Sequence, residues 1–244
     1  MQNLYDLMHE PQHCLRRPDR ECSVSHSVEH CTSIKTLRRF SRPQLPVRGG
    51  TSHAMKILSV CTARSDIRLI QGRAVPSAIG KRAVAGPVAV HALGLAGDEQ
   101  ADQTVHGGLS KAVYAYPVAH YPFWQGVRAQ ARVAPQDAAL PHGFMGENLT
   151  IDGLLEEKLW IGDQLRLPGC VLAVSEPRQP CFKFNDVMGF NQASKLMAQS
   201  GYCGAYLGVI VPGQLAAGDE IELVPGPREL NLRELFMARM RRRG

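Results

Sequence analysis

Short apolar runs separated by turn residues dominate the middle of the chain. Between residues 55 and 225, segments rich in Val, Ile, Leu and Tyr recur between Gly, Pro and Asp residues. Runs of this kind with turn residues on both sides are typical of β-strands. We predict strands over residues 56–62, 87–92, 111–116, 164–167, 170–175, 205–211 and 220–224. So many short strands predict a mainly β domain, either a barrel or a sandwich.

Helical signals are fewer. Residues 118–132 follow Pro117, which suits a helix start, and residues 191–200 precede Gly201, which can end a helix. One more short helix is expected over residues 230–240. The sequence therefore predicts a β core accompanied by a few short helices.

Residues 162–167 and 218–223 repeat one pattern, in which a Gly-Asp pair leads into a strand with alternating apolar residues. Glycine supplies the positive φ of a tight turn, and the Asp side chain can bond its own backbone. These properties account for both copies without any chemistry. We assign them a structural role, in support of a barrel.

The segment before residue 55 shows neither the periodicity of a helix nor that of a strand. It mixes Arg, His, Ser, Cys and Pro. We predict a disordered extension over residues 1–54, and a misplaced start codon is one explanation for it. A barrel domain is expected over residues 55–226, followed by a short basic helix or tail over residues 227–244. The spacing of His26 and His30 from Cys22 and Cys31 fits no standard finger, so zinc is not expected. Acidic residues in the extension argue against a targeting peptide.

The net charge of +6 is concentrated at the two ends of the chain, and the middle is nearly balanced. A nucleic-acid duplex needs a continuous basic face, so we expect a small anionic ligand and no nucleic acid. No apolar stretch is long enough for a signal peptide core or a membrane span. The seven cysteines contain no Cys-x-x-Cys pair and predict no disulfide framework. The expected compartment is the reducing cytoplasm, with no membrane partner.

Two glycine-containing segments carry more polar chemistry than a barrel needs. Gly107 and Gly108 let backbone approach a ligand while the side chains of His106 and Lys111 point at it, which suits phosphate or another anion; a surface turn is the alternative. In residues 143–149, Glu147 and Asn148 lie between a glycine turn and a probable strand. The Asn148 amide offers a donor and an acceptor to a heterocycle, and a capped turn is the alternative.

The segment 175–185 holds Arg178 and Cys181 between prolines that stiffen the backbone. A cysteine close to Arg178 and Lys183 is biased toward the thiolate, the form that binds soft metals or attacks electrophiles. A buried, inert cysteine is the alternative, and we assign that state to the cysteines in apolar runs, Cys61, Cys170 and Cys203. Ser-His-Asp, Walker, dinucleotide-binding and His-Glu-x-x-His motifs are all missing from the sequence.

Taken in order, several motifs resemble the MOSC-domain family, and within it the stand-alone bacterial YiiM type. They are Gly97-Asp98-Glu99-Gln100, Val105-His106-Gly107-Gly108, Lys111-Ala112-Val113-Tyr114, Gly146-Glu147-Asn148-Leu149 and Pro177-Arg178-Gln179-Pro180-Cys181. The likeness runs from about residue 55 to residue 224. It implies a MOSC-type β-barrel, similar to the pyruvate kinase β-barrel and related to the C-terminal domain of molybdenum cofactor sulfurases.

The resemblance also implies a cofactor and a set of site residues. The cofactor is the molybdenum cofactor, a molybdopterin, bound in a cleft with Cys181 as the metal ligand. The motif positions expected to bind it are His106, Gly107, Gly108, Lys111, Asn148 and Arg178. Cys181, Arg178 and His106 are the expected catalytic residues.

The implied activity is that of a molybdenum-dependent oxidoreductase, which reduces N-hydroxylated substrates such as hydroxylaminopurine bases and so detoxifies them. Oxygen passes to reduced molybdenum, and the metal carries the redox step. No flavin or iron-sulfur motif is present in the sequence, so the resemblance implies a separate electron-donating reductase.

Two other functions stay open at this point. The protein could be a sulfur carrier or cofactor-handling protein with a persulfide on Cys181, or a non-enzymatic anion-binding barrel. The YiiM type usually continues past the barrel into a small helical region, whereas this chain has only the short helix predicted over residues 230–240. If that region caps the cleft or docks the reductase, the partner or activity is expected to differ.

Overall fold

The structure is a computed structural model that describes residues 55–101 and 107–242. The predicted extension over residues 1–54, with its histidines and cysteines, lies outside the described residues. So do residues 102–106, which include His106, and residues 243–244.

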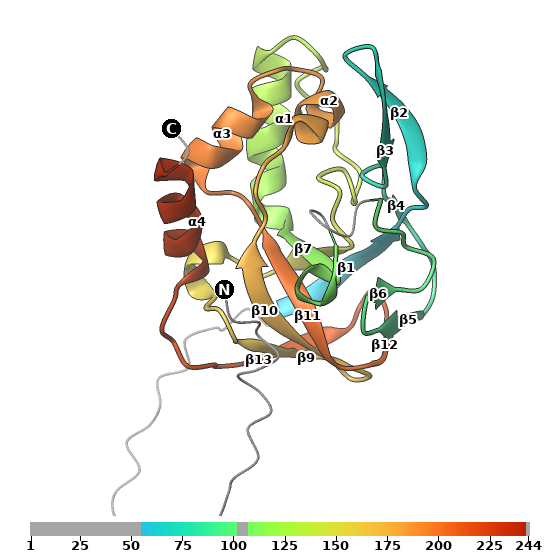
Figure 1. Cartoon of the computed structure of the whole chain (residues 1–244), viewed down its shortest axis with the longest axis vertical. Helices are drawn as coiled ribbons and strands as arrows, with labels where there is room; N and C mark the ends of the chain where they lie inside the picture. Colours follow the sequence, from blue (N-terminus) through green and yellow to red (C-terminus); the bar gives the residue numbers. More distant parts are fainter. Residues whose placement is uncertain (1–54, 102–106, 243–244) are drawn as a thin grey trace, which may run out of the picture. The chain divides into compact units, whose positions relative to one another are not determined.

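Strands of the described chain close into a seven-stranded barrel (Figure 1). Their order around the barrel is β13-β9-β10-β11-β7-β8-β1, and pairing of β1 with β13 closes it. The β7–β8 pair is parallel and the other six are antiparallel. The bounds are β1 Met55–Thr62, β7 Val113–Pro117, β8 Leu149–Asp152, β9 Gln164–Arg166, β10 Val171–Pro177, β11 Ala205–Val211 and β13 Glu220–Val224. The predicted β-barrel is confirmed.

Aliphatic side chains fill the barrel interior. Along β1, Ile57 is completely buried, whereas the next residue, Leu58, is 37% exposed. This alternation follows from the two-residue period of a strand, which sends neighbouring side chains to opposite faces. The other completely buried aliphatic residues of the barrel core include Leu149, Ile151, Leu165, Leu172 and Leu207. Each contributes about 1.5–3 kcal/mol by leaving water.

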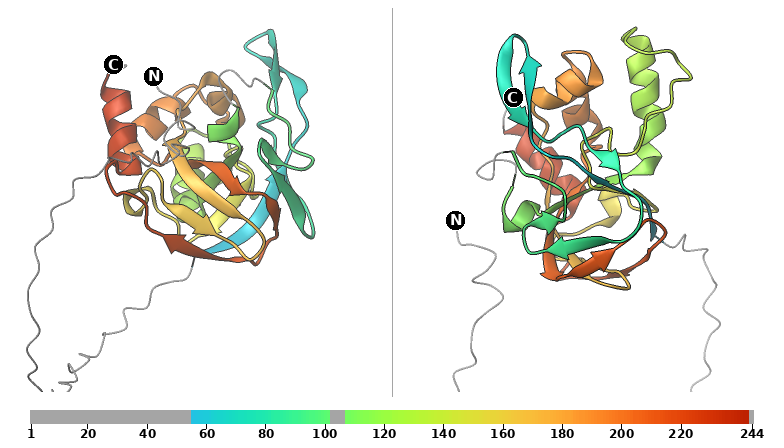
Figure 2. Two further views of the ribbon diagram at one scale, coloured as in Figure 1. Left: turned by 60° about the horizontal axis from the view of Figure 1, so that its bottom comes forward. Right: turned by 90° about the vertical axis from the view of Figure 1, so that its right-hand side faces the viewer.

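Shorter strands lie outside the closed barrel. The strands β5 Val88–His91, β6 Gly94–Leu95 and β12 Gly213–Leu215 form a small sheet, and β4 Arg82–Ala83 pairs with β1. A hairpin of β2 Asp66–Ile70 and β3 Arg73–Ser77 forms a separate ribbon (Figure 2). Its two turn residues, Gln71 and Gly72, have φ of 51° and 76°, as a tight two-residue hairpin requires. The sequence analysis did not predict this hairpin.

Four α-helices pack on one side of the barrel around a second, aromatic core (Figure 1). They are α1 Tyr121–Gln130, α2 Phe182–Met188, α3 Ala193–Ser200 and α4 Leu232–Arg241. The helices predicted over residues 118–132, 191–200 and 230–240 are confirmed, and Gly201 ends α3 with φ of 76°. The sequence analysis missed α2. Among the described helices, none has the length and apolar character needed to cross a membrane.

The two Gly-Asp turns have the structural role predicted for them. Gly162 and Gly218 have φ of 89° and 97°. Asp163 Oδ2 accepts a hydrogen bond from the Trp160 amide at 3.0 Å, and Asp219 Oδ2 accepts one from the Ala216 amide at 2.8 Å. The strands that follow, β9 and β13, are neighbours in the barrel. The turns therefore start two adjacent strands in the same way.

Candidate functional site

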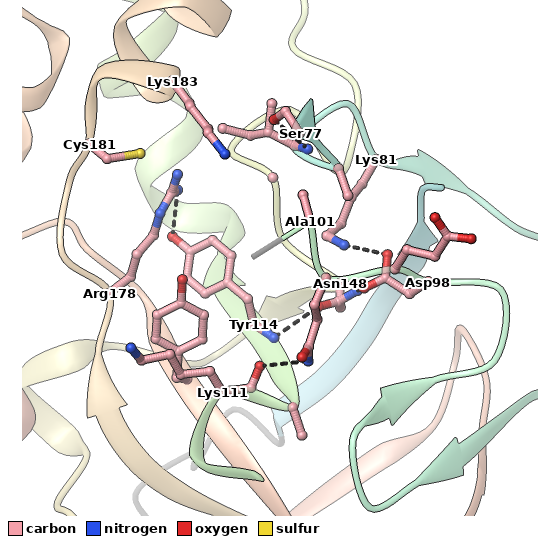
Figure 3. A pocket seen from close by; sticks show the side chains of 17 residues that line it. Ser77, Lys81, Asp98, Ala101, Lys111, Tyr114, Asn148, Arg178, Cys181 and Lys183 are labelled. Atoms are coloured by element: carbon pink, nitrogen blue, oxygen red, sulfur yellow. Dashed lines mark hydrogen bonds and ion pairs between the residues drawn. The ribbon is translucent and has the colours of Figure 1, made fainter. Parts of the chain in front are cut away.

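A cleft lies between the segment after β3, the start of β7 and the start of α2 (Figure 3). The residues that line it are Ser77, Ala78, Ile79, Lys81, Asp98, Glu99, Gln100, Ala101, Lys111, Ala112, Tyr114, Gly146, Asn148, Arg178, Cys181, Lys183 and Tyr206. All three polar segments selected from the sequence contribute to it.

Cys181 lies at the cleft, directly before α2, with extended backbone. Its carbonyl accepts hydrogen bonds from the Phe184 amide at 3.0 Å and from Ser194 Oγ at 2.9 Å, which fix the chain at this point. Its side chain is directed to the same part of the cleft as those of Arg178 and Lys183 (Figure 3). Of the four cysteines in the described part, Cys181 is the one that is not buried.

The other described cysteines have the properties expected of inert thiols. Cys61, Cys170 and Cys203 are buried. Burial raises the pKa of Cys61 and of Cys170 to about 11, and raises that of Cys203 as well. Their predicted burial is confirmed. A thiolate at neutral pH is therefore disfavoured at all three positions.

Arg178 follows the last residue of β10 and is 5% exposed. Its Nη1 donates to Met145 O at 2.6 Å and to Tyr114 Oη at 3.3 Å, and the guanidinium lies 4.9 Å from the Tyr114 ring centroid. No carboxylate within the described ranges pairs with it. Because the guanidinium stays protonated, and a buried charge is costly without a counter-charge, this site favours an anionic ligand.

Lys81 and Asp98 form a buried ion pair in the cleft, with side chains 8% and 6% exposed (Figure 3). Asp98 Oδ1 also accepts from the Ala63 amide at 2.9 Å. Burial lowers the pKa of Lys81, and the Asp98 carboxylate opposes that change. The sequence analysis did not select Lys81, because nothing local relates it to a carboxylate 17 residues away.

Asn148 lies at the floor of the cleft, where it ties three parts of the chain together. Its Oδ1 accepts from the Tyr114 amide at 3.0 Å, and its Nδ2 donates to Cys61 O at 3.1 Å and to Asp98 Oδ2 at 2.9 Å. Both N–H groups are therefore committed inside the protein. The predicted contact of Asn148 with the cofactor depends on the second lone pair of Oδ1.

Glu147 caps the glycine turn before it rather than facing the cleft. Its Oε1 accepts hydrogen bonds from the Gly143 amide and from Thr150 Oγ1, each at 2.9 Å, and from the Tyr121 hydroxyl. Its Oε2 is buried and has no partner in the part of the chain that the structure describes. Burial raises the pKa of this carboxyl group. The capped-turn alternative holds for Glu147.

The glycine segment contributes Lys111 to the cleft. Lys111 ends the short 3-10 helix Leu109–Lys111 and lies before β7, not within it as predicted. Its Nζ is 3.9 Å from Glu176 Oε1. Gly108, with φ of 91°, donates its amide to Gln100 Oε1 at 3.0 Å. Gly107 and Gly108 are not among the described residues that line the cleft, and His106 lies outside the described ranges.

Two further cleft residues, Tyr114 and Tyr206, had no role assigned from the sequence. Tyr114 and Tyr206 are register partners on β7 and β11. Lys183 donates from Nζ to Pro76 O at 2.8 Å, so it links α2 to the hairpin. Tyr114 is in one of the motifs that carry the family resemblance, but only strand pairing brings Tyr206 beside it.

Comparison with known proteins decides the family. Residues 102–222 match the model of the MOSC domain. The protein named Protein YiiM of Escherichia coli (strain K12) is 39% identical over 160 residues, which cover 65% of this chain and 69% of that protein. The chain belongs to the MOSC family. The predicted likeness to its YiiM type is thereby confirmed.

Two further proteins extend the comparison. The crystal structure of YiiM from Geobacillus stearothermophilus matches with a TM-score of 0.61 and 28% identity, over 78% of this chain and 85% of that one. A protein of Gibberella moniliformis (strain M3125 / FGSC 7600) named Reductase is 36% identical over 173 residues, which cover 69% of this chain and 30% of that protein. The region similar to this chain therefore makes up under a third of the fungal protein.

Proposed function

We propose that this MOSC protein binds the molybdenum cofactor in the cleft, with Cys181 as the metal ligand, and reduces N-hydroxylated compounds such as hydroxylaminopurine bases. The observation that carries the proposal is the thiol of Cys181 at a cleft that also holds the buried Arg178 guanidinium, for which no described carboxylate is a partner. A thiolate suits a soft metal centre, and a guanidinium suits an anionic group.

The charges of the cleft fit a cofactor that bears a phosphate and a dithiolene. Its lining has four cationic side chains, Lys81, Lys111, Arg178 and Lys183, and two acidic ones, Asp98 and Glu99. The difference is a net charge of +2. The Asp98 carboxylate pairs with Lys81 and therefore does not neutralise Arg178. The positive charge of Arg178 can therefore act on a ligand. A donor set of one soft thiol and several cations therefore fits this group.

Each of these residues has a distinct part in the proposed site. Cys181 would bind the metal, and Arg178 and Lys111 would neutralise the negative groups of the cofactor. Lys81 would add a fixed ammonium group, because Asp98 holds it in place. The contacts expected from His106, Gly107 and Gly108 stay predictions, because His106 lies outside the described ranges and neither glycine lines the cleft. When bound, the cofactor would supply two-electron redox chemistry, while the protein supplies orientation and electrostatics.

The electrons for this reaction must reach the cleft from another protein component. We infer a reductase partner. Support comes from the fungal relative named Reductase, because the match leaves 70% of that polypeptide for other parts. For this protein we propose that the electron donor is a separate reductase.

The test is the metal and pterin content of the full chain. The parent, Cys181→Ser and the control Cys170→Ala would be purified from a host that makes the molybdenum cofactor. Cys170 is a cysteine of the barrel core that does not line the cleft. We expect about one molybdenum and one pterin per chain in the parent and the control, and loss of the metal in Cys181→Ser.

Reduction of a hydroxylaminopurine by the loaded parent with an artificial electron donor would complete the support. A folded parent without metal and without pterin would overturn the proposal. Cyanide-labile sulfur on Cys181 in that protein would then identify a sulfur carrier. Without such sulfur, the protein would be an anion-binding barrel.

A further inference from the structure

Two tyrosines lie side by side in the cleft. Tyr114 on β7 and Tyr206 on β11 are register partners in the barrel, and their ring centroids are 5.3 Å apart. Both side chains line the cleft, together with Arg178 and Cys181. Both residues present a phenol to the cleft. They differ in the hydrogen bonds that their hydroxyl groups make.

The hydroxyl of Tyr114 is committed to the protein. It donates to Cys203 O at 2.8 Å. It also accepts from Arg178 Nη1 at 3.3 Å (Figure 3). The hydroxyl of Tyr206 makes no hydrogen bond to any described residue; the one bond of Tyr206 outside its strand pairing joins its carbonyl to Ser175 Oγ at 2.9 Å. Tyr206 therefore has a proton available for a molecule in the cleft.

Burial is the main reason that the hydroxyl of Tyr206 keeps its proton. Burial raises the pKa of Tyr206, Arg178 lowers it, and Cys181 and Glu176 raise it. The phenol is therefore protonated at neutral pH, and the guanidinium is close enough to stabilise a phenolate. Lys111 adds a second cation, with Nζ 6.0 Å from the Tyr206 ring centroid.

The proposed reaction requires protons in this cleft. Conversion of a hydroxylamine to an amine and water consumes two electrons and two protons. Most proton-bearing groups near Cys181 are committed: Tyr114 donates to Cys203 O, and Lys183 donates to Pro76 O. Arg178 does not release its proton in proteins. Across the cleft, Lys81 is paired with Asp98.

We propose that Tyr206 is a catalytic residue that donates a proton to the oxygen leaving the substrate. This inference rests on the proposed reductase function. The N–O bond would break as the reduced cofactor supplies two electrons, and the substrate oxygen would leave as water. Tyr206 gives one proton to that oxygen, and solvent gives the other to the nitrogen. Because hydroxide is a stronger base than phenolate, a phenol is acidic enough for this transfer, and solvent then reprotonates it.

The test compares Tyr206→Phe with the control Tyr202→Phe. Each variant loses one phenolic hydroxyl and keeps its ring. The Tyr202 ring stacks on His120 and does not line the cleft. We expect Tyr206→Phe to keep its molybdenum and pterin, to keep KM within about threefold, and to lose about 10²–10⁴-fold in kcat. Tyr202→Phe should match the parent in cofactor content and in kcat.

A Tyr206→Phe protein with full cofactor content and a kcat within about threefold of the parent would overturn the assignment. Loss of molybdenum or pterin from this variant would also overturn it, because the hydroxyl would then serve cofactor retention. A parent without cofactor or without reductase activity would overturn the proposed function as well.

If Tyr206→Phe fails to fold, 3-fluorotyrosine at position 206 replaces it. The more acidic phenol should move the alkaline limb of the kcat profile to lower pH, and an unmoved limb would rule out proton donation.

Discussion

At the residue scale, neighbouring polar side chains of the MOSC barrel have different tasks. Glu147 and Asn148 are adjacent in the chain and both are buried. Asn148 lines the cleft and is hydrogen-bonded to Asp98 and Tyr114. Glu147 instead accepts a hydrogen bond from the Gly143 amide in the glycine turn. The two side chains therefore reach different partners from the loop just before β8. Burial of the Glu147 carboxyl therefore affects stability rather than ligand binding.

This burial predicts a pH dependence of stability that Glu147→Gln should remove. The pKa of Glu147 is raised above its ordinary value of 4.5. The folded state therefore binds a proton that the unfolded state has lost above pH 4.5, and the contribution of Glu147 to stability declines as pH rises through the folded-state pKa. Urea unfolding at pH 5 and pH 8 would measure it. If the free energy of unfolding changes by the same amount between pH 5 and pH 8 in parent and variant, Glu147 does not titrate in this range.

At the scale of elements, the β2–β3 hairpin stands across the cleft from Cys181. Its strands pair with each other and with no other described strand. Two polar contacts join it to α2: Arg68 Nη2 lies 3.0 Å from Asp186 Oδ2, and Lys183 Nζ donates to Pro76 O. Since α2 begins directly after Cys181, these contacts should hold the hairpin close to the thiol.

Asp186→Asn should therefore make Cys181 more accessible. Because the pair is partly exposed, we expect the rate of iodoacetamide alkylation of Cys181 to rise by at most about fivefold. Mass spectrometry of the peptide that contains Cys181 gives this rate. The control is Asp137→Asn, at an exposed residue outside the cleft. The difference should disappear at about 1 M salt, which screens the pair. Equal rates at low salt would exclude a role for the ion pair in access.

At the scale of the whole domain, the barrel depends on the pairing of its first strand with its last. β1 pairs with β13 through Met55 and Ile221, and with β8 on its other side. Ile57 on β1 is completely buried in the barrel core. The same strand carries Cys61, whose carbonyl accepts from Asn148 below the cleft. Closure of the barrel and the floor of the site therefore share one strand.

Truncation of Ile57 should destabilise the domain strongly, and truncation of its neighbour should not. We expect Ile57→Ala to cost about 2–5 kcal/mol of unfolding free energy, because it leaves a cavity in the barrel. Leu58→Ala, at the exposed neighbouring position, should cost less than about 1 kcal/mol. Urea unfolding midpoints of both variants would measure the difference. Similar midpoints would mean that the barrel interior adapts to the lost volume.

The sequence by itself determined the local parts of this protein. The strands β11 and β13 have the bounds predicted from apolar runs and turn residues, because those signals lie within the strands themselves. Arg178 and Cys181 were selected for a similar reason, since they are close together in a segment stiffened by prolines. The hairpin was missed although Ile67 and Leu69 of β2 alternate with polar residues. These two side chains are 61% and 76% exposed, so they belong to a ribbon outside the barrel core.

Only the tertiary structure decided which side chains meet in the cleft. Lys81 reaches Asp98 from 17 residues away, and Asn148 reaches Cys61 from 87 residues away. Tyr206 lies beside Tyr114 because β11 pairs with β7 in one register. A shift of one residue in that register would turn either side chain to the other face of the barrel. Register is fixed by the packing of the whole barrel core, and no local pattern in the sequence contains it.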